Sequence, residues 1–150
     1  MEKYVIVDID GTISQVSEER LKFLKQKPKD WDAFYKLCFN DKPIPEMVEL
    51  VQTLIDSHKY EIVFCTGRRK TVMIPTVEWI SKYFNGLRVI NICMRKDKDI
   101  RHDTEVKPEL LAKRGATPEN TAFILEDRAS MCKKWRELGF RCLQVDEGDF

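Results

Sequence analysis

The sequence has 150 residues, of which 43% are apolar and 34% are charged, and its 26 basic residues nearly balance 25 acidic ones. This composition argues against disorder, and the length suits one domain over residues 1–150. No apolar run approaches the roughly 20 residues of a membrane-spanning helix, and no signal-peptide pattern precedes the first strand. We therefore expect a cytoplasmic protein with no membrane partner, and the net charge of +1 by itself requires no nucleic-acid partner.

The first predicted strand ends in two carboxylates, within the run V-I-V-D-I-D-G-T at residues 5–12. Side chains alternate along a strand, so Asp8 and Asp10 point the same way. Two such charges repel each other unless a cation lies between them or one of them is protonated. Carboxylates are ligands that Mg²⁺ prefers, and Gly11 permits a tight turn. The pattern favours a metal site, although Asp and Gly also form ordinary turns.

The next segment reads as a small helical insertion over roughly residues 14–42. Pro28 interrupts it, and Asp30 is placed to cap a second short helix. That helix carries apolar positions at helical spacing, which include Trp31, Phe34 and Tyr35. We expect the insertion to act as a small cap over the site, while ordinary core packing of its aromatic residues remains the alternative. An amphipathic helix follows at residues 46–58.

The second predicted strand, residues 61–65, runs into Thr66, Gly67 and Arg68. A hydroxyl group followed by glycine at the end of a strand can present the hydroxyl and backbone N–H groups to a phosphate oxygen. Arg68 adds a planar donor pair that suits phosphate. The triplet is weak evidence alone, since Thr-Gly also forms turns, but it repeats the arrangement at the end of the first strand.

The central part of the chain continues the alternation of helix and strand. We expect Pro75 to open a helix that runs through residue 84, and a third strand at residues 87–94. The mixed-charge stretch 95–103 is typical of a solvated loop. It leads to Lys107, just before Pro108 opens a short helix, and a lysine fixed near a phosphate would stabilise developing charge.

A fourth predicted strand, residues 121–125, ends in Glu126 and Asp127. A helix at 129–138 and a fifth strand at 141–145 complete the alternation. Strands that alternate with helices predict an α/β fold with a five-stranded parallel sheet covered by helices on both faces. Ligands of such sheets bind beyond the carboxyl ends of the strands. That edge would collect Asp8, Asp10, Thr66 and Asp127, with Lys107 arriving from a neighbouring helix start.

These motifs resemble those of the haloacid dehalogenase (HAD) superfamily of phosphohydrolases. D-I-D-G-T matches its first motif, Thr66 its second, Lys107 its third, and Glu126-Asp127 its fourth. A narrower likeness to the 3'-phosphatase domains of T-even phage polynucleotide kinase-phosphatases rests on N-D-K-P-I-P-E-M-V-E-L, C-T-G-R, H-D-T-E-V-K-P-E, L-E-D-R and V-D-E-G-D-F. The sequence contains no G-x-x-x-x-G-K-[ST] motif, so we expect no 5'-kinase activity from this chain.

The resemblance implies catalytic roles for several residues. Asp8 would attack phosphorus to give an aspartyl-phosphate. Asp10 would protonate the leaving alkoxide and then deprotonate the hydrolytic water, with its pKa raised by ionised Asp8. Thr66 and Lys107 would hold the phosphate oxygens.

The likeness also implies a Mg²⁺ cofactor and further active-site residues. Mg²⁺ would be held by Asp8, by the backbone carbonyl of Asp10 and by Asp127. Arg68 would be an additional catalytic residue, and Gly67 and Asp103 would contact the substrate. Two positions depart from the phage pattern: Glu126 replaces an aspartate, and Arg20 matches a family arginine only approximately, so neither receives a role.

The predicted function is Mg²⁺-dependent removal of a 3'-phosphate from an RNA or DNA end, a repair role in the host cytoplasm if the chain is phage-encoded. Phosphatase action on free nucleotides or other small phosphomonoesters is the alternative. A phospho-accepting signalling domain fits less well, because Asp10 is placed to hydrolyse the intermediate. Nothing in the sequence indicates an obligate protein partner. A groove for flanking phosphates could draw on Arg68, Arg69, Lys70, Arg95, Lys96, Lys98 and Arg101.

Overall fold

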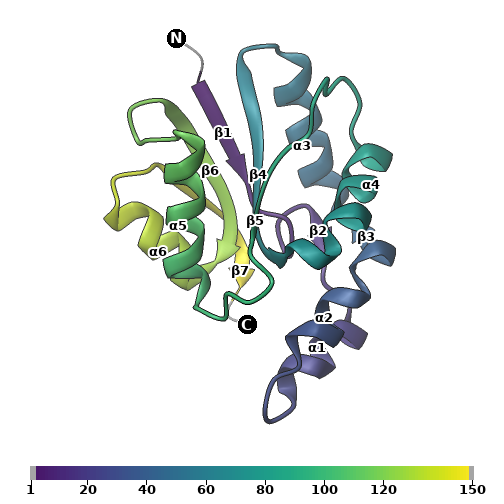
Figure 1. Cartoon of the computed structure of the whole chain (residues 1–150). Helices are drawn as coiled ribbons and strands as arrows, with labels where there is room; N and C mark the ends of the chain where they lie inside the picture. Colours follow the sequence, from purple (N-terminus) through teal and green to yellow (C-terminus); the bar gives the residue numbers. More distant parts are fainter. Residues whose placement is uncertain (1–2, 149–150) are drawn as a thin grey trace.

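The computed structural model describes residues 3–148 and centres on one parallel sheet (Figure 1). The sheet has five strands in the order β5-β4-β1-β6-β7, and every neighbouring pair is parallel. Its strands are β1 (Lys3–Val7), β4 (Tyr60–Arg69), β5 (Asn91–Arg95), β6 (Thr121–Arg128) and β7 (Cys142–Gly148). The outermost residues of the expected 1–150 domain, including the end of V-D-E-G-D-F, lie outside the described range.

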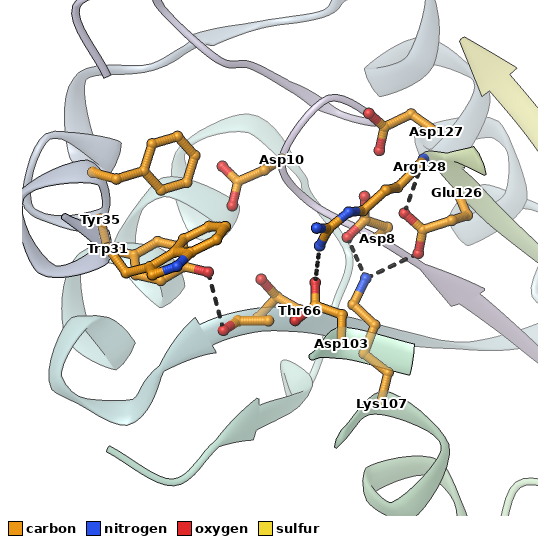
Figure 2. Close-up of a pocket in the computed structure, with 12 residues that line it drawn as sticks. Asp8, Asp10, Trp31, Tyr35, Thr66, Asp103, Lys107, Glu126, Asp127 and Arg128 are labelled. Carbon is orange, nitrogen blue, oxygen red and sulfur yellow. Dashed lines mark hydrogen bonds and ion pairs between the residues drawn. The ribbon is translucent and has the colours of Figure 1, made fainter. Parts of the chain in front are cut away.

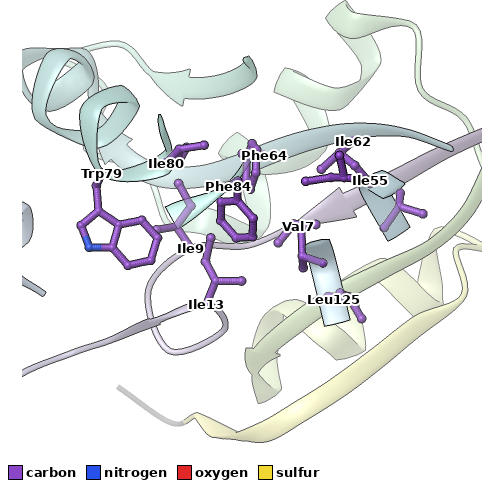
Figure 3. Close-up of a cluster of buried hydrophobic side chains, with 12 residues drawn as sticks. Val7, Ile9, Ile13, Ile55, Ile62, Phe64, Trp79, Ile80, Phe84 and Leu125 are labelled. Atoms are coloured by element: carbon purple, nitrogen blue, oxygen red, sulfur yellow. The ribbon is translucent and has the colours of Figure 1, made fainter. Parts of the chain in front are cut away.

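Helices cover both faces of the sheet, as the sequence predicts. They are α3 (Pro45–Asp56), α4 (Met73–Tyr83), α5 (Asp103–Arg114) and α6 (Ala129–Glu137), with a short η2 (Lys70–Val72) before α4. On one face, β1 and β4 pack against α3 and α4 in an apolar cluster that includes Val7, Phe64 and Ile80 (Figure 3). On the other face, Ile6 and Val63 pack among residues of α5 and α6. The α/β fold with a central parallel sheet is therefore confirmed.

A separate group of short elements lies between β1 and α3. It comprises β2 (Ser14–Gln15), α1 (Glu18–Lys25), α2 (Trp31–Lys36), η1 (Cys38–Asn40) and β3 (Lys42–Pro43). The antiparallel pair β2-β3 closes its base, and α1 and α2 project from the sheet beyond the carboxyl end of β1 (Figure 1). Asp30 caps α2 by accepting a hydrogen bond from the Ala33 N–H, as expected. We call residues 14–43 the insertion.

Several element boundaries differ from the prediction. The third strand begins at Asn91 rather than residue 87, because β5 gains its partner β4 only from that point and Val89 is 69% exposed. Strands β4 and β6 run on through Arg69 and Arg128, and their ladders become irregular after Thr66 and Glu126.

The helix expected after Pro108 begins earlier, at Asp103, so Lys107 lies inside α5 rather than at a helix start. The His102 side chain caps this helix by accepting from the Thr104 N–H. Burial of Val106 and Lys107 outweighs the backbone hydrogen bond that Pro108 cannot donate. In residues 3–148, no helix is long and apolar enough to cross a membrane.

Candidate active site

The structure brings the predicted residues together in one cavity at the carboxyl edge of the sheet (Figure 2). The cavity is small, with a volume of about 20 Å³. Its lining contains seven of the predicted site residues: Asp8, Asp10, Thr66, Gly67, Asp103, Lys107 and Asp127. The chain positions that supply them lie up to 119 residues apart, from β1 to β6, so the parallel topology is what makes them neighbours. Arg68 does not line this cavity.

Lys107 connects two of the acidic groups. Its Nζ lies 2.8 Å from Asp8 Oδ1 and 2.9 Å from Glu126 Oε2, and the residue is 2% exposed. Burial alone would lower the pKa of Lys107, but the charges of Asp8 and Glu126 hold it well above its ordinary value. Lys107 is therefore a fixed cation beside Asp8. Glu126, to which the sequence assigns no role, is the second anchor of this lysine.

Asp8, Glu126 and Asp127 form an acidic cluster, in which one carboxylate oxygen of each residue lies within 4.8 Å of the other two. Burial, and then the charge of Asp8, raises the pKa of Glu126 to about 8 and that of Asp127 to about 9. The Thr12 hydroxyl lies 2.9 Å from Asp8 Oδ2 and 3.3 Å from Asp127 Oδ1. A cluster of carboxylate oxygens in this crowded arrangement suits a hard divalent cation, which would offset their repulsion.

Asp10 has different surroundings from Asp8. Arg68 donates from Nε to Asp10 Oδ2 at 2.9 Å and from Nη2 to Asp10 Oδ1 at 2.8 Å. Arg20 Nη1 donates to the same Oδ1 at 2.8 Å. Burial would raise the pKa of Asp10, but Arg68 and Arg20 together lower it below its ordinary value. The expected increase in this pKa is therefore not found, because the two guanidinium groups outweigh the effect of burial.

The sequence suggested that Arg68 presents its guanidinium group to a phosphate. In the structure this group faces protein atoms instead. Its third nitrogen, Nη1, donates to the Thr76 hydroxyl at 3.0 Å, and the whole residue is 1% exposed. All the guanidinium nitrogens of Arg68 thus have partners within the protein. Its place is behind Asp10, where it fixes the orientation of that carboxylate.

Arg20 and Asp41 are site residues that the sequence reading did not assign. Arg20 is fully buried, and its Nε donates to the Phe34 carbonyl at 2.7 Å while Nη1 lies 2.5 Å from Asp41 Oδ2. Ser17 caps α1 and sets the phase of that helix. The sequence does contain an indication that Arg20 is buried, since Arg20 precedes Leu24 by four residues and so occupies the apolar face of α1.

The carboxyl-terminal end of β4 is held close to the start of α5. The Gly67 carbonyl accepts from Tyr35 Oη at 3.2 Å and from Arg95 Nε at 2.7 Å. A Cβ atom at Gly67 would collide with the Asp103 carboxylate, so this close approach requires glycine. Asp103 in turn pairs with Arg95 and with Arg128 Nη1, the latter at 3.0 Å. Arg95 is thus buried and internal, rather than part of a solvated loop.

Aromatic residues of the insertion form the other side of the cavity. Trp31, Phe34 and Tyr35 line it opposite the carboxylates, and Figure 2 shows Trp31 and Tyr35 across the pocket from Asp8 and Lys107. The Trp31 and Tyr35 rings are stacked, with centroids 5.9 Å apart. The insertion therefore contributes directly to the site, in addition to forming a small apolar cluster of its own.

Comparison with solved structures first identifies the fold. A HAD family enzyme of Bacteroides thetaiotaomicron, solved with magnesium and inorganic phosphate, superposes with a TM-score of 0.56 at 14% identity and covers 100% of this chain and 97% of its own. A predicted phosphatase from Clostridium acetobutylicum gives a TM-score of 0.69 at 13% identity, covering 99% of this chain and 86% of its own. The fold is the HAD-like α/β fold.

The particular family follows from the sequence comparison. Residues 2–150 match the model of the polynucleotide kinase PNKP phosphatase domain, and the chain belongs to this family of HAD-type phosphatases. The Pnkp1/Rnl/Hen1 RNA repair complex contains a similar chain, with a TM-score of 0.77 and 25% identity over 99% of this chain and 44% of that one.

A curated relative also carries a polynucleotide kinase name. A protein of Autographa californica nuclear polyhedrosis virus that bears the name of a bifunctional polynucleotide kinase/RNA ligase is 25% identical over 134 residues. The match covers 89% of this chain but 18% of the viral protein. This chain therefore corresponds to one part of longer relatives.

Proposed function

We propose that this domain removes the 3'-phosphate from nucleic-acid ends by Mg²⁺-dependent hydrolysis through an aspartyl-phosphate. The observation that carries the proposal is the position of Asp8, which pairs with the Lys107 cation and belongs to the acidic cluster with Glu126 and Asp127. The family match supports a polynucleotide as substrate. The insertion, residues 14–42 in our expectation, would serve as a small cap because its aromatic side chains already line the cavity.

In the first step, an Asp8 oxygen attacks phosphorus and the bond from phosphorus to the 3'-oxygen breaks. The leaving oxygen takes a proton from Asp10. Thr66 and Lys107 hold the phosphoryl oxygens, with the charge of Lys107 offsetting negative charge that develops in the transition state. Mg²⁺ would be held by Asp8, the Asp10 backbone carbonyl and Asp127, and when bound it neutralises charge between the nucleophile and the phosphate.

In the second step, the Asp10 carboxylate removes a proton from water, the oxygen of that water bonds to phosphorus, and the bond to Asp8 breaks. Inorganic phosphate and free Asp8 result. The pairing of Asp10 with Arg20 and Arg68 favours the carboxylate form that this step uses. The protonated form of Asp10, which donates its proton in the first step, is therefore the less favoured form. Binding of the substrate must stabilise it.

Phosphate release from three substrates tests the proposal: a 3'-phosphorylated oligonucleotide, a 5'-phosphorylated one and a free nucleoside monophosphate, each with Mg²⁺ and with EDTA. We expect Mg²⁺-dependent release from the 3' end. Equal or faster release from the free nucleotide would instead favour a small-metabolite phosphatase. Full activity in the Asp8→Asn variant, or in EDTA, would contradict the mechanism.

A further inference from the structure

Two further hollows continue from the active-site cavity along the insertion. The first has a volume of about 360 Å³ and shares Trp31, Tyr35, Asp103 and Arg128 with the active-site cavity. The second, of about 410 Å³, shares Lys29, Trp31 and Arg69 with the first. Trp31 therefore borders all three spaces. We call the two hollows together the groove.

The part of the groove next to the active site is mainly cationic. Its charged lining consists of Lys29, Arg69, Arg95, Arg101, Asp103 and Arg128, so five cations face one carboxylate. Arg69 pairs with Asp32, which lines the second hollow. Arg101 pairs with Asp99 and Glu109, which line neither hollow. Lys29 makes no ion pair within residues 3–148, and its Nζ lies 5.7 Å from the Trp31 ring centre. The charge of Lys29 is thus available to an anion that enters the groove.

Trp31 offers an aromatic surface in this cationic setting. The residue is half-buried, and its ring stacks on Tyr35 with an interplanar angle of 28°. The other two tryptophans, Trp79 and Trp135, are 2% and 1% exposed and belong to the core. A cationic groove with an accessible aromatic ring suits single-stranded nucleic acid, whose bases stack on the ring while the phosphates contact the cations.

We propose that the groove binds the nucleotides that precede the 3'-terminal phosphate. Trp31 stacks on a base, and Lys29 and Arg69 contact the adjacent phosphodiester. Because the base must be unstacked to reach Trp31, the favoured substrate is a single-stranded end with at least one internucleotide phosphate, not a free nucleotide. This inference rests on the proposed function and adds the feature of the substrate that the domain recognises.

The test compares kcat/KM for a 3'-phosphorylated trinucleotide with that for a nucleoside 3'-monophosphate. We expect the wild type to favour the trinucleotide by about tenfold or more, since stacking and phosphate contacts each contribute. Trp31→Ala should remove most of this preference, and Trp31→Phe should restore part of it because a ring remains. Lys29→Ala should weaken the salt dependence of trinucleotide hydrolysis.

Two control variants change an aromatic residue and a lysine outside the groove. Phe39 is 47% exposed on η1, and Lys36 is exposed at the end of α2, and neither lines the cavity or the groove. Phe39→Ala and Lys36→Ala should keep the wild-type preference. An equal loss of preference in these controls would overturn the assignment to the groove.

The remaining outcomes separate this inference from the proposed function. If the wild type releases 3'-phosphate from the trinucleotide but Trp31→Ala and Lys29→Ala keep its preference, the groove assignment is wrong and the proposed function stands. If no 3'-phosphorylated substrate is hydrolysed, the proposed function fails. The groove is then tested by titrating a 3'-hydroxyl oligonucleotide, which should quench tryptophan fluorescence through Trp31, and an absence of quenching would overturn the inference.

Discussion

Replacing Arg20 with alanine should strongly destabilise the protein as well as impair catalysis. Arg20 is fully buried, and its guanidinium group contacts the Asp10 and Asp41 carboxylates and the Phe34 carbonyl. Its Cζ also lies 4.1 Å from the centre of the Phe34 ring. The Arg20→Ala substitution removes all these contacts and leaves buried carboxylates with fewer partners.

The expected loss is large because one partner of a buried ion pair is removed, which costs about 3–5 kcal/mol. For a domain of this size, each 1 kcal/mol lowers Tm by about 2–4 °C, so Tm should fall by about 6–20 °C. Thermal unfolding followed by circular dichroism measures this change. The kcat of folded Arg20→Ala should also fall, since Arg68 alone then orients Asp10.

The matched control is Arg101→Ala, which removes the same side chain from a solvent-exposed pair. Arg101 and Glu109 are 42% and 53% exposed at their side chains, and solvent-exposed ion pairs contribute little to stability. Arg101→Ala should therefore leave Tm close to that of the wild type. A similar small change for Arg20→Ala would refute the reasoning that the buried network stabilises the fold.

Three further predictions concern the acidic cluster. Asp8→Asn should reduce phosphate release by at least about a thousandfold, because the covalent step loses its nucleophile, and steady-state assays with 3'-phosphorylated oligonucleotide check this. Mg²⁺ at about 100 times its Kd should stabilise the wild type by about 2.7 kcal/mol and so raise its Tm. Asp127→Asn should abolish this increase in Tm, and an increase that persists in the variant would argue against the site. Gly11→Ala should also weaken Mg²⁺ binding, because Gly11 has a φ of 82° and an added Cβ would collide with the Asp127 carboxylate. Calorimetric titration measures this affinity, and an unchanged Kd for Mg²⁺ would contradict the geometry.

The sequence by itself determined the type of fold and the edge where the site lies. Apolar strands that end in Asp8, Thr66 and Asp127, with helical segments between them, are compatible with a parallel sheet that brings these residues to one edge. These are consequences of local period and order along the chain, which the sequence displays directly.

The partners of each charged side chain were decided by the tertiary structure. Arg68 lies two residues after Thr66, yet its direction toward Asp10 follows from a bulged strand end and from the Thr76 hydroxyl on α4. Lys107 lies within α5, where Glu126 from β6 holds it beside Asp8. Such contacts join distant segments, and periodicity within one segment carries no information about them.

In the insertion, too, the sequence indicates the local elements and the tertiary structure determines their contacts. Its helical spacing indicated a short aromatic helix, but whether Trp31 and Tyr35 would face the core or the site depended on how the β2-β3 pair directs the insertion over the sheet edge. Arg20 and Asp41 acquire their roles only there, since Arg20 pairs with Asp10 and Asp41, and Asp41 also pairs with Arg68. Local sequence fixed the elements, and long-range packing fixed which charges meet, because burial makes an unpaired charge costly and selects the arrangement that pairs it.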